Sequence, residues 1–278
     1  SRTPSGPSVN LEFWGVGDEV GAYETAIGRF RAVYPRVTIN YRKFDEENYE
    51  DELLNAYLNG KAPDIFMIRH NSLPKHYSRL APLPQQKFNL ESLRSFFPEV
   101  VEQNFAPDGL IFALPLSIDT LVLYYNRDIF DQASVTTLPA TWEELQNTIL
   151  LTRRLDSAGR VTRAGAAIGG SEKTIDKASD LLSLLMMQSG TEMTNKDFTQ
   201  ATFNSPLGKG ALEFYLKFTN PANVYYTWNE NLKFSLDAFG NEETAMIFDY
   251  GYRQKDIEKK NPFLKFAKLP MVQPRQAQ

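Results

Sequence analysis

Aromatic side chains near the ends of predicted strands are the residues of this sequence best suited to hold a ligand. Trp14 ends a strand, Trp228 lies in a loop after Pro221, and Tyr250 and Tyr252 directly follow a strand. A flat apolar ring with Asp, Asn and Arg nearby suits a sugar, because a sugar has a C–H-rich face and a rim of hydroxyl groups. Ordinary packing is the alternative for each ring alone. For the four rings taken together at strand ends, a binding surface is as good an explanation as packing.

Residues that most enzymes and metal sites need are scarce. The chain has no Cys, which removes thiol nucleophiles, disulfides, iron–sulfur clusters and Cys-ligated zinc. His70 and His76 lack the i, i+4 spacing of a helical zinc site, and no Gly-x-Ser-x-Gly elbow accompanies them. Gly165 and Gly170 have the spacing of a phosphate loop, but Ser171 stands where that loop needs a Lys. We therefore expect no catalytic residue, metal or cofactor. A Ser-His-Asp hydrolase or a glycosidase carboxylate pair stays conceivable.

Length and charge narrow the class of protein further. The chain has 278 residues, enough for two domains with sizeable cores. Its 30 Lys and Arg are outnumbered by 34 Asp and Glu, which gives a net charge of −4. We expect no nucleic-acid partner, because phosphate binding needs a clustered basic surface. No apolar run approaches the about 20 residues of a membrane span. Residues 1–8 read as a flexible polar leader, either a tether left after removal of a signal or anchor, or a cloning remnant.

The first part of the chain alternates between strand and helix patterns. Alternation with a period of two predicts strands, and apolar spacing with a period near 3.6 predicts helices. The predicted elements are a strand at 9–14, a helix at 23–34, a strand at 37–41, a helix at 49–58 and a strand at 64–68. The last strand is an unbroken apolar run, which suits a strand covered on both faces of a parallel sheet. The β-α-β-α-β order indicates an open α/β sheet with right-handed connections.

The rest of the chain changes character after a Pro-rich stretch. Thr141 and Glu144 form a capping-box pattern at a helix start, and Ser205 with Pro206 forms an N-cap followed by Pro at the first helical position. Trp142, in the capping turn, is predicted to belong to the core. The other predicted elements are helical structure near 90–105, strands at 110–114, 120–125, 161–168, 245–249 and 263–269, and helices at 176–189, 206–218 and 231–239.

Six short segments, in order along nearly the whole chain, resemble the family 1 extracellular solute-binding proteins that deliver sugars to ABC importers. They are LEFWG at 11–15, FRAVYP at 30–35, GKAPDI at 60–65, ALPLSIDTLVLYYNR at 113–127, PATWEEL at 139–145 and FGNEETAMI at 239–247. Each motif is weak alone, but six in order are fairly specific. The resemblance, to sugar receptors of the maltose-binding-protein type, implies a non-enzymatic protein with a type II periplasmic-binding-protein fold. In that fold, two α/β lobes of open sheets flanked by helices are joined by hinge strands, and the ligand lies in the cleft between them.

The resemblance also implies how the chain is divided. We expect lobe 1 to comprise 9–116 and 270–278, and lobe 2 to comprise 117–269, with crossings near 115–120 and 265–272. Members of the family continue well beyond the return crossing. The C-terminal part of the fold is therefore expected to be missing here, because the sequence is either a piece of a longer chain or a short variant.

Position along the strands gives the candidate ligand-binding residues, because ligands collect beyond the carboxyl ends of strands in open α/β sheets. In the first lobe they are Trp14, Asp18, Glu19, Arg69, His70 and Asn71, and in the second lobe Gly170, Ser171, Glu172, Trp228, Tyr250 and Tyr252, with Asp119 at the crossing. Structural explanations stay open for several of them. Asp18 and Glu19 can simply favour a helix N-terminus, Asp119 can tie down the hinge backbone, and His70 can be a surface loop residue.

These observations lead to a functional expectation. We expect a monomeric receptor outside the cytoplasm, periplasmic or held at the cell surface as a lipoprotein. It would close on a mono- or oligosaccharide by a hinge motion and deliver it unaltered to the membrane permease subunits of an ABC importer. The alternatives are a receptor of the same fold for a polyamine, an iron complex or a peptide, a secreted carbohydrate-active enzyme, and a structural or signalling adaptor. An iron site would need clustered Tyr and carboxylate groups, and Tyr250 and Tyr252 keep this alternative open.

Overall fold

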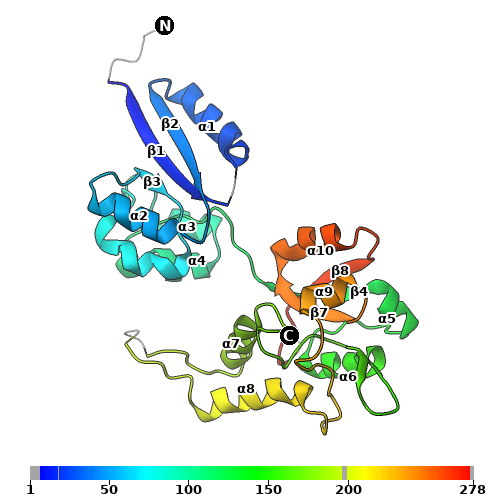
Figure 1. The fold of residues 1–278 in the computed structure, drawn as a ribbon. Helices are drawn as coiled ribbons and strands as arrows, with labels where there is room; N and C mark the ends of the chain where they lie inside the picture. The colour runs from blue at the N-terminus through cyan, green and yellow to red at the C-terminus, as the bar shows by residue number, and fades with distance from the viewer. Residues whose placement is uncertain (1–6, 18, 196–198, 276–278) are drawn as a thin grey trace. The chain divides into compact units, whose positions relative to one another are not determined.

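The computed structural model describes residues 7–17, 19–195 and 199–275, which form two compact units (Figure 1). The boundary between the units lies between Leu116 and Ser117. Residues 271–275 belong to the second unit, where the N–H of Gln273 donates to the carbonyl of Ala140 and its carbonyl accepts from Trp142. This differs from the expectation that 270–278 return to the first lobe. The reason is that β-type pairing with residues beside Thr141 holds this segment, and residues 276–278 lie outside the described part.

The first unit is built on a parallel sheet with strand order β2-β1-β3. Its elements are β1 (Val9–Val16), α1 (Gly21–Val33), β2 (Val37–Phe44), α2 (Tyr49–Leu58), β3 (Ile65–Phe66), the 3₁₀ helix η1 (His70–Arg79), α3 (Leu90–Phe96), α4 (Glu99–Phe105) and η2 (Pro107–Gly109). Strands β1 and β2 pair along their whole length, from Val9 opposite Val37 to Val16 opposite Phe44. The predicted β-α-β-α-β order is confirmed.

Two predicted strands of the first unit turn out short or absent. Strand β3 has only two residues, and Ile65 is 42% exposed, so the prediction of a strand covered on both faces is wrong. Residues 110–114 do not form a strand. Their backbone groups bond elsewhere: the N–H of Phe112 donates to Phe105 in α4, and the carbonyl of Ile111 accepts from Leu83. A loop and a helix end thus satisfy this segment instead of a neighbouring strand.

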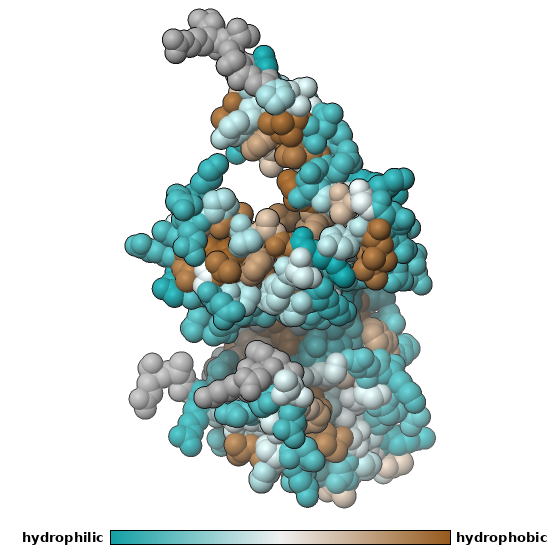
Figure 2. All heavy atoms as spheres, turned by 90° about the vertical axis from the view of Figure 1, so that its left-hand side faces the viewer, coloured by the Kyte–Doolittle hydropathy of each residue, from teal (hydrophilic) through white to brown (hydrophobic). Residues whose placement is uncertain are grey.

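The first unit has two small hydrophobic clusters instead of one large core. One contains Trp14, Phe44, Tyr49 and Leu53, and the other contains Leu93, Val101, Ala106 and Ile111. Hydrophilic residues cover most of the face shown in Figure 2, and the hydrophobic areas between them are separate from one another. Within the described residues, no helix of either unit combines the length and the apolar character needed to cross a lipid bilayer.

The second unit is built on an antiparallel sheet with strand order β7-β4-β8, beside a short β5-β6 ladder. Its elements are β4 (Leu121–Asn126), α5 (Arg127–Gln132), α6 (Trp142–Thr152), β5 (Arg154–Leu155), β6 (Val161–Arg163), α7 (Ala178–Gln188), α8 (Pro206–Leu216), η3 (Lys217–Thr219), α9 (Ser235–Gly240), β7 (Met246–Tyr250), η4 (Gly251–Arg253), α10 (Gln254–Lys260) and β8 (Phe266–Pro270). Of the predicted strand at 161–168, only β6 forms a regular strand. Isolated β-bridges at Ala164 and Ala167 continue the segment alongside β7. The predicted helix at 231–239 is shorter, because only α9 forms.

The central sheet of the second unit is buried on both faces. Leu123 of β4 and Phe248 of β7 belong to one hydrophobic cluster, whereas their neighbours Tyr124 and Ile247 belong to another. Successive side chains of a strand point to opposite faces, so the alternation places one cluster on each side of the sheet. This double burial fixes the end of β7, from which the candidate site projects.

Two predicted helix starts are confirmed. The hydroxyl of Thr141 accepts from the N–H of Glu144, and the Glu144 carboxylate accepts from the N–H of Thr141, so the capping box is complete. The hydroxyl of Ser205 accepts from the N–H of Gly208 at the start of α8. Trp142 is 6% exposed and lies in the core, as predicted.

The capping box makes Thr141 a testable source of stability. Thr141→Ala removes the acceptor for one otherwise unpaired N–H, and we expect the free energy of unfolding to fall by about 1 kcal/mol. Urea unfolding followed by circular dichroism measures the change. Thr137→Ala, at an exposed position just upstream, is the matched control. Equal effects of the two variants would contradict the importance of the cap.

Candidate ligand-binding site

Two stacked tyrosine rings at the end of β7 form the candidate binding surface. Tyr250 is the last residue of β7 and Tyr252 lies in η4, and their ring centroids are 6.1 Å apart with planes inclined by 14°. Tyr252 is 54% exposed and Tyr250 is half-buried. We call these two rings the tyrosine face. It offers flat apolar surface to a ligand, with polar atoms at its edge.

Asp119 holds the backbone beneath the tyrosine face. Its Oδ1 accepts hydrogen bonds from the N–H groups of Thr120 (2.8 Å) and Gly251 (3.1 Å), and its Oδ2 accepts from Tyr252 (2.8 Å). A Cβ at residue 251 would lie 2.8 Å from Asp119 Oδ1, so this close approach needs glycine. The structure therefore brings three predicted site residues together. The same bonds show Asp119 tying down backbone, the structural explanation that the sequence left open.

The hydroxyl groups around the tyrosine face are neutral donors. The Tyr250 hydroxyl donates to Asp180 Oδ2 at 3.1 Å. Burial, and then the nearby Asp180 carboxylate, raises the pKa of Tyr250 to about 12. The Tyr124 hydroxyl lies 3.0 Å from the carbonyl oxygen of Tyr250 and 2.9 Å from that of Gly251. These contacts join the turn at the end of β7 to α7 and to β4.

Behind the tyrosine face lies a partly buried ionic network that the sequence did not reveal. Asp249 is 1% exposed, and its Oδ1 accepts from the N–H of Tyr250 at 2.7 Å. Arg253 donates to Asp176 and to Asp256 Oδ2, the latter at 2.9 Å. The Arg253 guanidinium carbon also lies 5.1 Å from the centroid of the Tyr252 ring, within range of a cation–π interaction. The one available signal was the i, i+4 spacing of Asp249 and Arg253, whose charged groups the turn from β7 into η4 brings to 3.7 Å.

The buried Asp249 carboxyl binds its proton unusually tightly. Burial raises the pKa of Asp249 to about 6, and the negative charge of Asp176 acts in the same direction. The Tyr250 N–H and the charges of Arg253 and Lys177 oppose the shift without cancelling it. Desolvation disfavours the charged form of a carboxyl group. Asp249 therefore changes charge in a pH range where ordinary carboxyl groups are already ionised.

The structure does not support Trp228 and Gly170 as ligand contacts. Trp228 is fully buried, and its Nε1 donates to Thr174 Oγ1 at 3.1 Å. A Cβ at Gly170 would lie 2.8 Å from Trp228 Cδ1, so the indole packs directly on the glycine backbone. The aromatic ring that the sequence placed in a binding loop is a core residue, because the loop folds inward against the turn at 169–170.

The other predicted residues of this turn bond within the unit but outside the tyrosine face. Ser171 donates to Glu230 through its N–H (2.6 Å) and its hydroxyl (3.0 Å). Glu172 accepts from the hydroxyl of Ser179, which lowers the pKa of Glu172. Both Ser171 and Glu172 are exposed. Whether either contacts a ligand stays a prediction.

In the first unit, Trp14 is a packing residue instead of an exposed platform. It is 7% exposed, its ring centroid lies 4.4 Å from that of Phe44, and the Arg42 guanidinium lies 5.4 Å from its ring. The prediction of a ligand-facing ring at the end of β1 is not supported, because α2 supplies Tyr49 and Leu53 to the same cluster.

The remaining candidates of the first unit that the structure describes are exposed. Glu19 pairs with Lys43 at 2.6 Å, and Arg69 pairs with Glu46. His70 and Asn71 lie at the start of η1. Asp18 lies outside the described residues. For this group, and for the expected closure of two lobes around a ligand, ligand contact stays a prediction.

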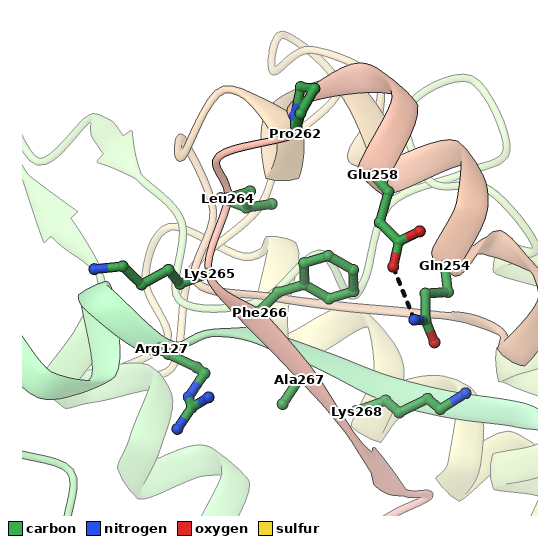
Figure 3. A pocket seen from close by; sticks show the side chains of 9 residues that line it. All are labelled: Arg127, Gln254, Glu258, Pro262, Leu264, Lys265, Phe266, Ala267 and Lys268. Atoms are coloured by element: carbon green, nitrogen blue, oxygen red, sulfur yellow. Dashed lines mark hydrogen bonds between the residues drawn. The ribbon is translucent and has the colours of Figure 1, made fainter.

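A hollow of about 680 Å³ lies beside β8 and α10 of the second unit (Figure 3). In Figure 3, Gln254 and Glu258 pair with each other, at 2.8 Å, while Lys265 points away from them. Phe266 is the one aromatic side chain of its lining, and it is half-buried. The hollow lacks paired exposed rings, so the tyrosine face is the stronger candidate. Among the described residues, no group of three or more His, Asp or Glu side chains is arranged to hold a metal ion.

The burial of Trp228 predicts that its loss affects stability. We expect Trp228→Ala to lower the free energy of unfolding by about 3–5 kcal/mol, because it leaves a large cavity. Trp228→Phe should cost less, since it keeps most of the volume and loses the bond to Thr174. Phe263→Ala, at a side chain that is 92% exposed, is the control for truncating an aromatic ring. Urea unfolding measures all three. A Trp228→Ala protein of unchanged stability would contradict the assignment.

The raised pKa of Asp249 predicts a pH-dependent stability of definite sign. The pKa of Asp249 in the folded protein lies above its ordinary value, so the folded state holds the proton more tightly than the unfolded state does. The contribution of Asp249 to the free energy of unfolding therefore falls as pH rises from about 4 to about 6. The loss amounts to something on the order of 2 kcal/mol. Asp249→Asn removes it, so the stability of the variant relative to the natural protein should rise over this range. Urea unfolding at several pH values measures the difference. A constant difference would show that Asp249 does not titrate there.

Known proteins resemble this chain over most of its length. Residues 16–276 match the family described as bacterial extracellular solute-binding protein. A Brucella abortus (strain 2308) protein, described only as a binding protein, is 22% identical over 251 residues, covering 88% of this chain and 58% of its own. The arabinooligosaccharide-binding protein of Halalkalibacterium halodurans is 26% identical over 132 residues, which are 46% of this chain and 30% of that protein.

The fold has close counterparts among solved structures. The cyclic α-maltosyl-1,6-maltose binding protein of Arthrobacter globiformis superposes with a TM-score of 0.75 at 18% identity, covering 97% of this chain and 67% of that one. The present chain thus spans about 58% of the length of its Brucella relative. The match over residues 16–276 and the shared type II periplasmic-binding fold lead to one conclusion: the chain belongs to the bacterial extracellular solute-binding protein family.

Proposed function

We propose that this protein is the receptor of a carbohydrate importer. It binds an oligosaccharide against the tyrosine face and hands it, chemically unaltered, to the membrane permease subunits of an ABC importer. The observation that carries the proposal is the pair of stacked rings at the end of β7, of which Tyr252 is 54% exposed. Flat exposed aromatic surface is what the C–H face of a sugar ring packs against.

The polar atoms around the tyrosine face suit the rim of a sugar. Asp119 is exposed at one edge, and each of its oxygens keeps acceptor capacity beyond the bonds to backbone N–H groups. The Asp180 carboxylate lies behind the Tyr250 hydroxyl. Two ring stacks contribute about 0.5–1.5 kcal/mol each, and four or five hydrogen bonds contribute about 1–3 kcal/mol each. After the costs of ordering are subtracted, the net binding free energy is on the order of 7–9 kcal/mol. That corresponds to roughly micromolar affinity, which suits a receptor that must release its cargo.

The comparisons support the substrate class and the place of action. The family is described as extracellular, and one relative is named for binding an arabinooligosaccharide. A receptor binds and releases without breaking bonds, so we propose that the protein has no catalytic activity. Hinge closure on the ligand, a lipid anchor and a monomeric state remain predictions of the same proposal.

A binding screen tests the proposal against its alternatives. We expect arabinotriose or maltotetraose to raise the melting temperature, whereas spermidine, ferric citrate and a tripeptide leave it unchanged. Chromatography of the sugar after incubation should recover it intact. A rise in melting temperature with a non-sugar solute would contradict the proposed substrate class. The appearance of shorter sugars would show that the protein is an enzyme and not a receptor.

The tyrosine face makes a sharper prediction for one side chain. Tyr252→Ala should weaken sugar binding by about 1–3 kcal/mol, which is roughly 5-fold to 150-fold in Kd, because a stacking surface is lost. Isothermal titration calorimetry measures the change. Tyr34→Ala, at a ring of the first unit that is 53% exposed, is the matched control and should bind like the natural protein. If both variants bind sugar equally well, Tyr252 lies outside the site.

A further inference from the structure

Two polar atoms buried behind the tyrosine face lack hydrogen-bond partners and belong to a facing pair of residues. Within the described part of the chain, Asp249 Oδ2 and Arg253 Nε are both buried without a partner. Arg253 Nε lies 3.7 Å from Asp249 Oδ1, too far for a hydrogen bond but close enough for a small movement to make one. Unpaired buried polar atoms are rare in folded proteins, and each calls for an explanation.

Charged and ionisable groups from several elements lie around this pair. Asp176 and Lys177, just before α7, act on Asp249, and Arg253 donates to Asp176. Further ionisable groups close to the pair or to the tyrosine face are Tyr124 of β4, Tyr252 of η4, Asp180 of α7 behind the Tyr250 hydroxyl, and Asp256 of α10. The Arg253 guanidinium thus lies within ion-pair distance of three carboxyl groups, those of Asp176, Asp249 and Asp256. It hydrogen-bonds to two of them and leaves Asp249 without a partner on Oδ2.

The position of Arg253 beside Asp249 couples the guanidinium to the charge of this carboxyl group. When the carboxyl is neutral, Arg253 can keep the hydrogen bonds to Asp176 and Asp256 that the structure shows. An ionised carboxylate buried at 1% exposure needs a charged donor, because an uncompensated buried charge is costly. Arg253 Nε is a charged donor 3.7 Å away, and closing the gap moves a guanidinium that lies 5.1 Å from the Tyr252 ring centroid.

We propose that Asp249 and Arg253 are positioning residues that hold the tyrosine face in a proton-dependent arrangement, so that a ligand on this face binds more tightly when Asp249 is protonated. The effect on ligand affinity rests on the proposed function of the tyrosine face. The effect on the two tyrosines does not, because it follows from contacts within the second unit.

The sign of the coupling follows from desolvation. Arg253 is 24% exposed and its guanidinium carbon lies 5.1 Å from the Tyr252 ring centroid, so a ligand seated on Tyr252 would lie close to the ionic network and displace water beside it. Removing water favours the neutral form of a buried carboxyl group. Ligand binding therefore favours protonation of Asp249, and by reciprocity protonation favours ligand binding. Affinity should rise as pH falls through about 6, the pKa to which burial raises Asp249.

The experiment has one arm without ligand and one with it. In the first, near-ultraviolet circular dichroism of the tyrosines is followed as pH is varied from about 5 to about 7.5. The natural protein should show a transition centred near pH 6 that Asp249→Asn lacks. In the second arm, calorimetry with maltotetraose and with arabinotriose compares Kd at the two ends of this range. We expect binding about 3-fold to 10-fold tighter at the lower pH in the natural protein, and a ratio near 1 in Asp249→Asn.

Asp237→Asn is the matched control, since Asp237 lies in the same unit, is 48% exposed and pairs with Lys260 on the surface. It should keep both the spectral transition and the affinity ratio. A natural protein whose tyrosine signal stays flat overturns the proposal without any ligand, and so does a transition that persists in Asp249→Asn. If neither sugar binds but the transition is lost only in Asp249→Asn, the proposed function fails while the support of the tyrosines by Asp249 stands.

Discussion

Carboxylate oxygens that accept from backbone N–H groups are the interaction on which the candidate site depends. The turn after β7 exposes three successive amide groups, and Asp249 takes that of Tyr250 while Asp119 takes those of Gly251 and Tyr252. A carboxylate that accepts from backbone N–H groups makes hydrogen bonds stronger than those between neutral groups. The two tyrosine rings therefore project from a backbone that is held in place, and an ordered binding surface loses less entropy when a ligand arrives.

The same arrangement explains why an acidic group is buried so close to the surface. Asp249 satisfies one amide of the turn, but its position at the end of a strand buried on both faces removes it from water. Arg253 moderates the cost without forming a hydrogen bond to it. The residue that shapes the turn is thus also the residue whose pKa burial raises. Such shifts are common where buried ionisable groups support functional surfaces.

Sequence patterns predicted the elements that local physics controls and missed those that depend on distant partners. The capping box at Thr141 and the N-cap at Ser205 formed as expected, because both involve atoms three residues apart. The strand expected at 110–114 did not form, since a strand needs a neighbour and this segment bonds to Leu83 and Phe105 instead. Tyr250 and Tyr252 were named from their place after a strand and Asp119 from its place at the expected crossing, and the structure brings the three together.

Chain composition and motif order by themselves determined the family, the two-part α/β organisation and the aromatic character of the candidate surface. Only the tertiary structure decided which aromatic rings face solvent. Trp228 and Tyr252 are both large aromatic residues in the same unit, yet one is fully buried against Gly170 and the other is 54% exposed. Burial depends on what the rest of the chain packs against a side chain, and those contacts join residues far apart in sequence, so spacing alone carries no record of them.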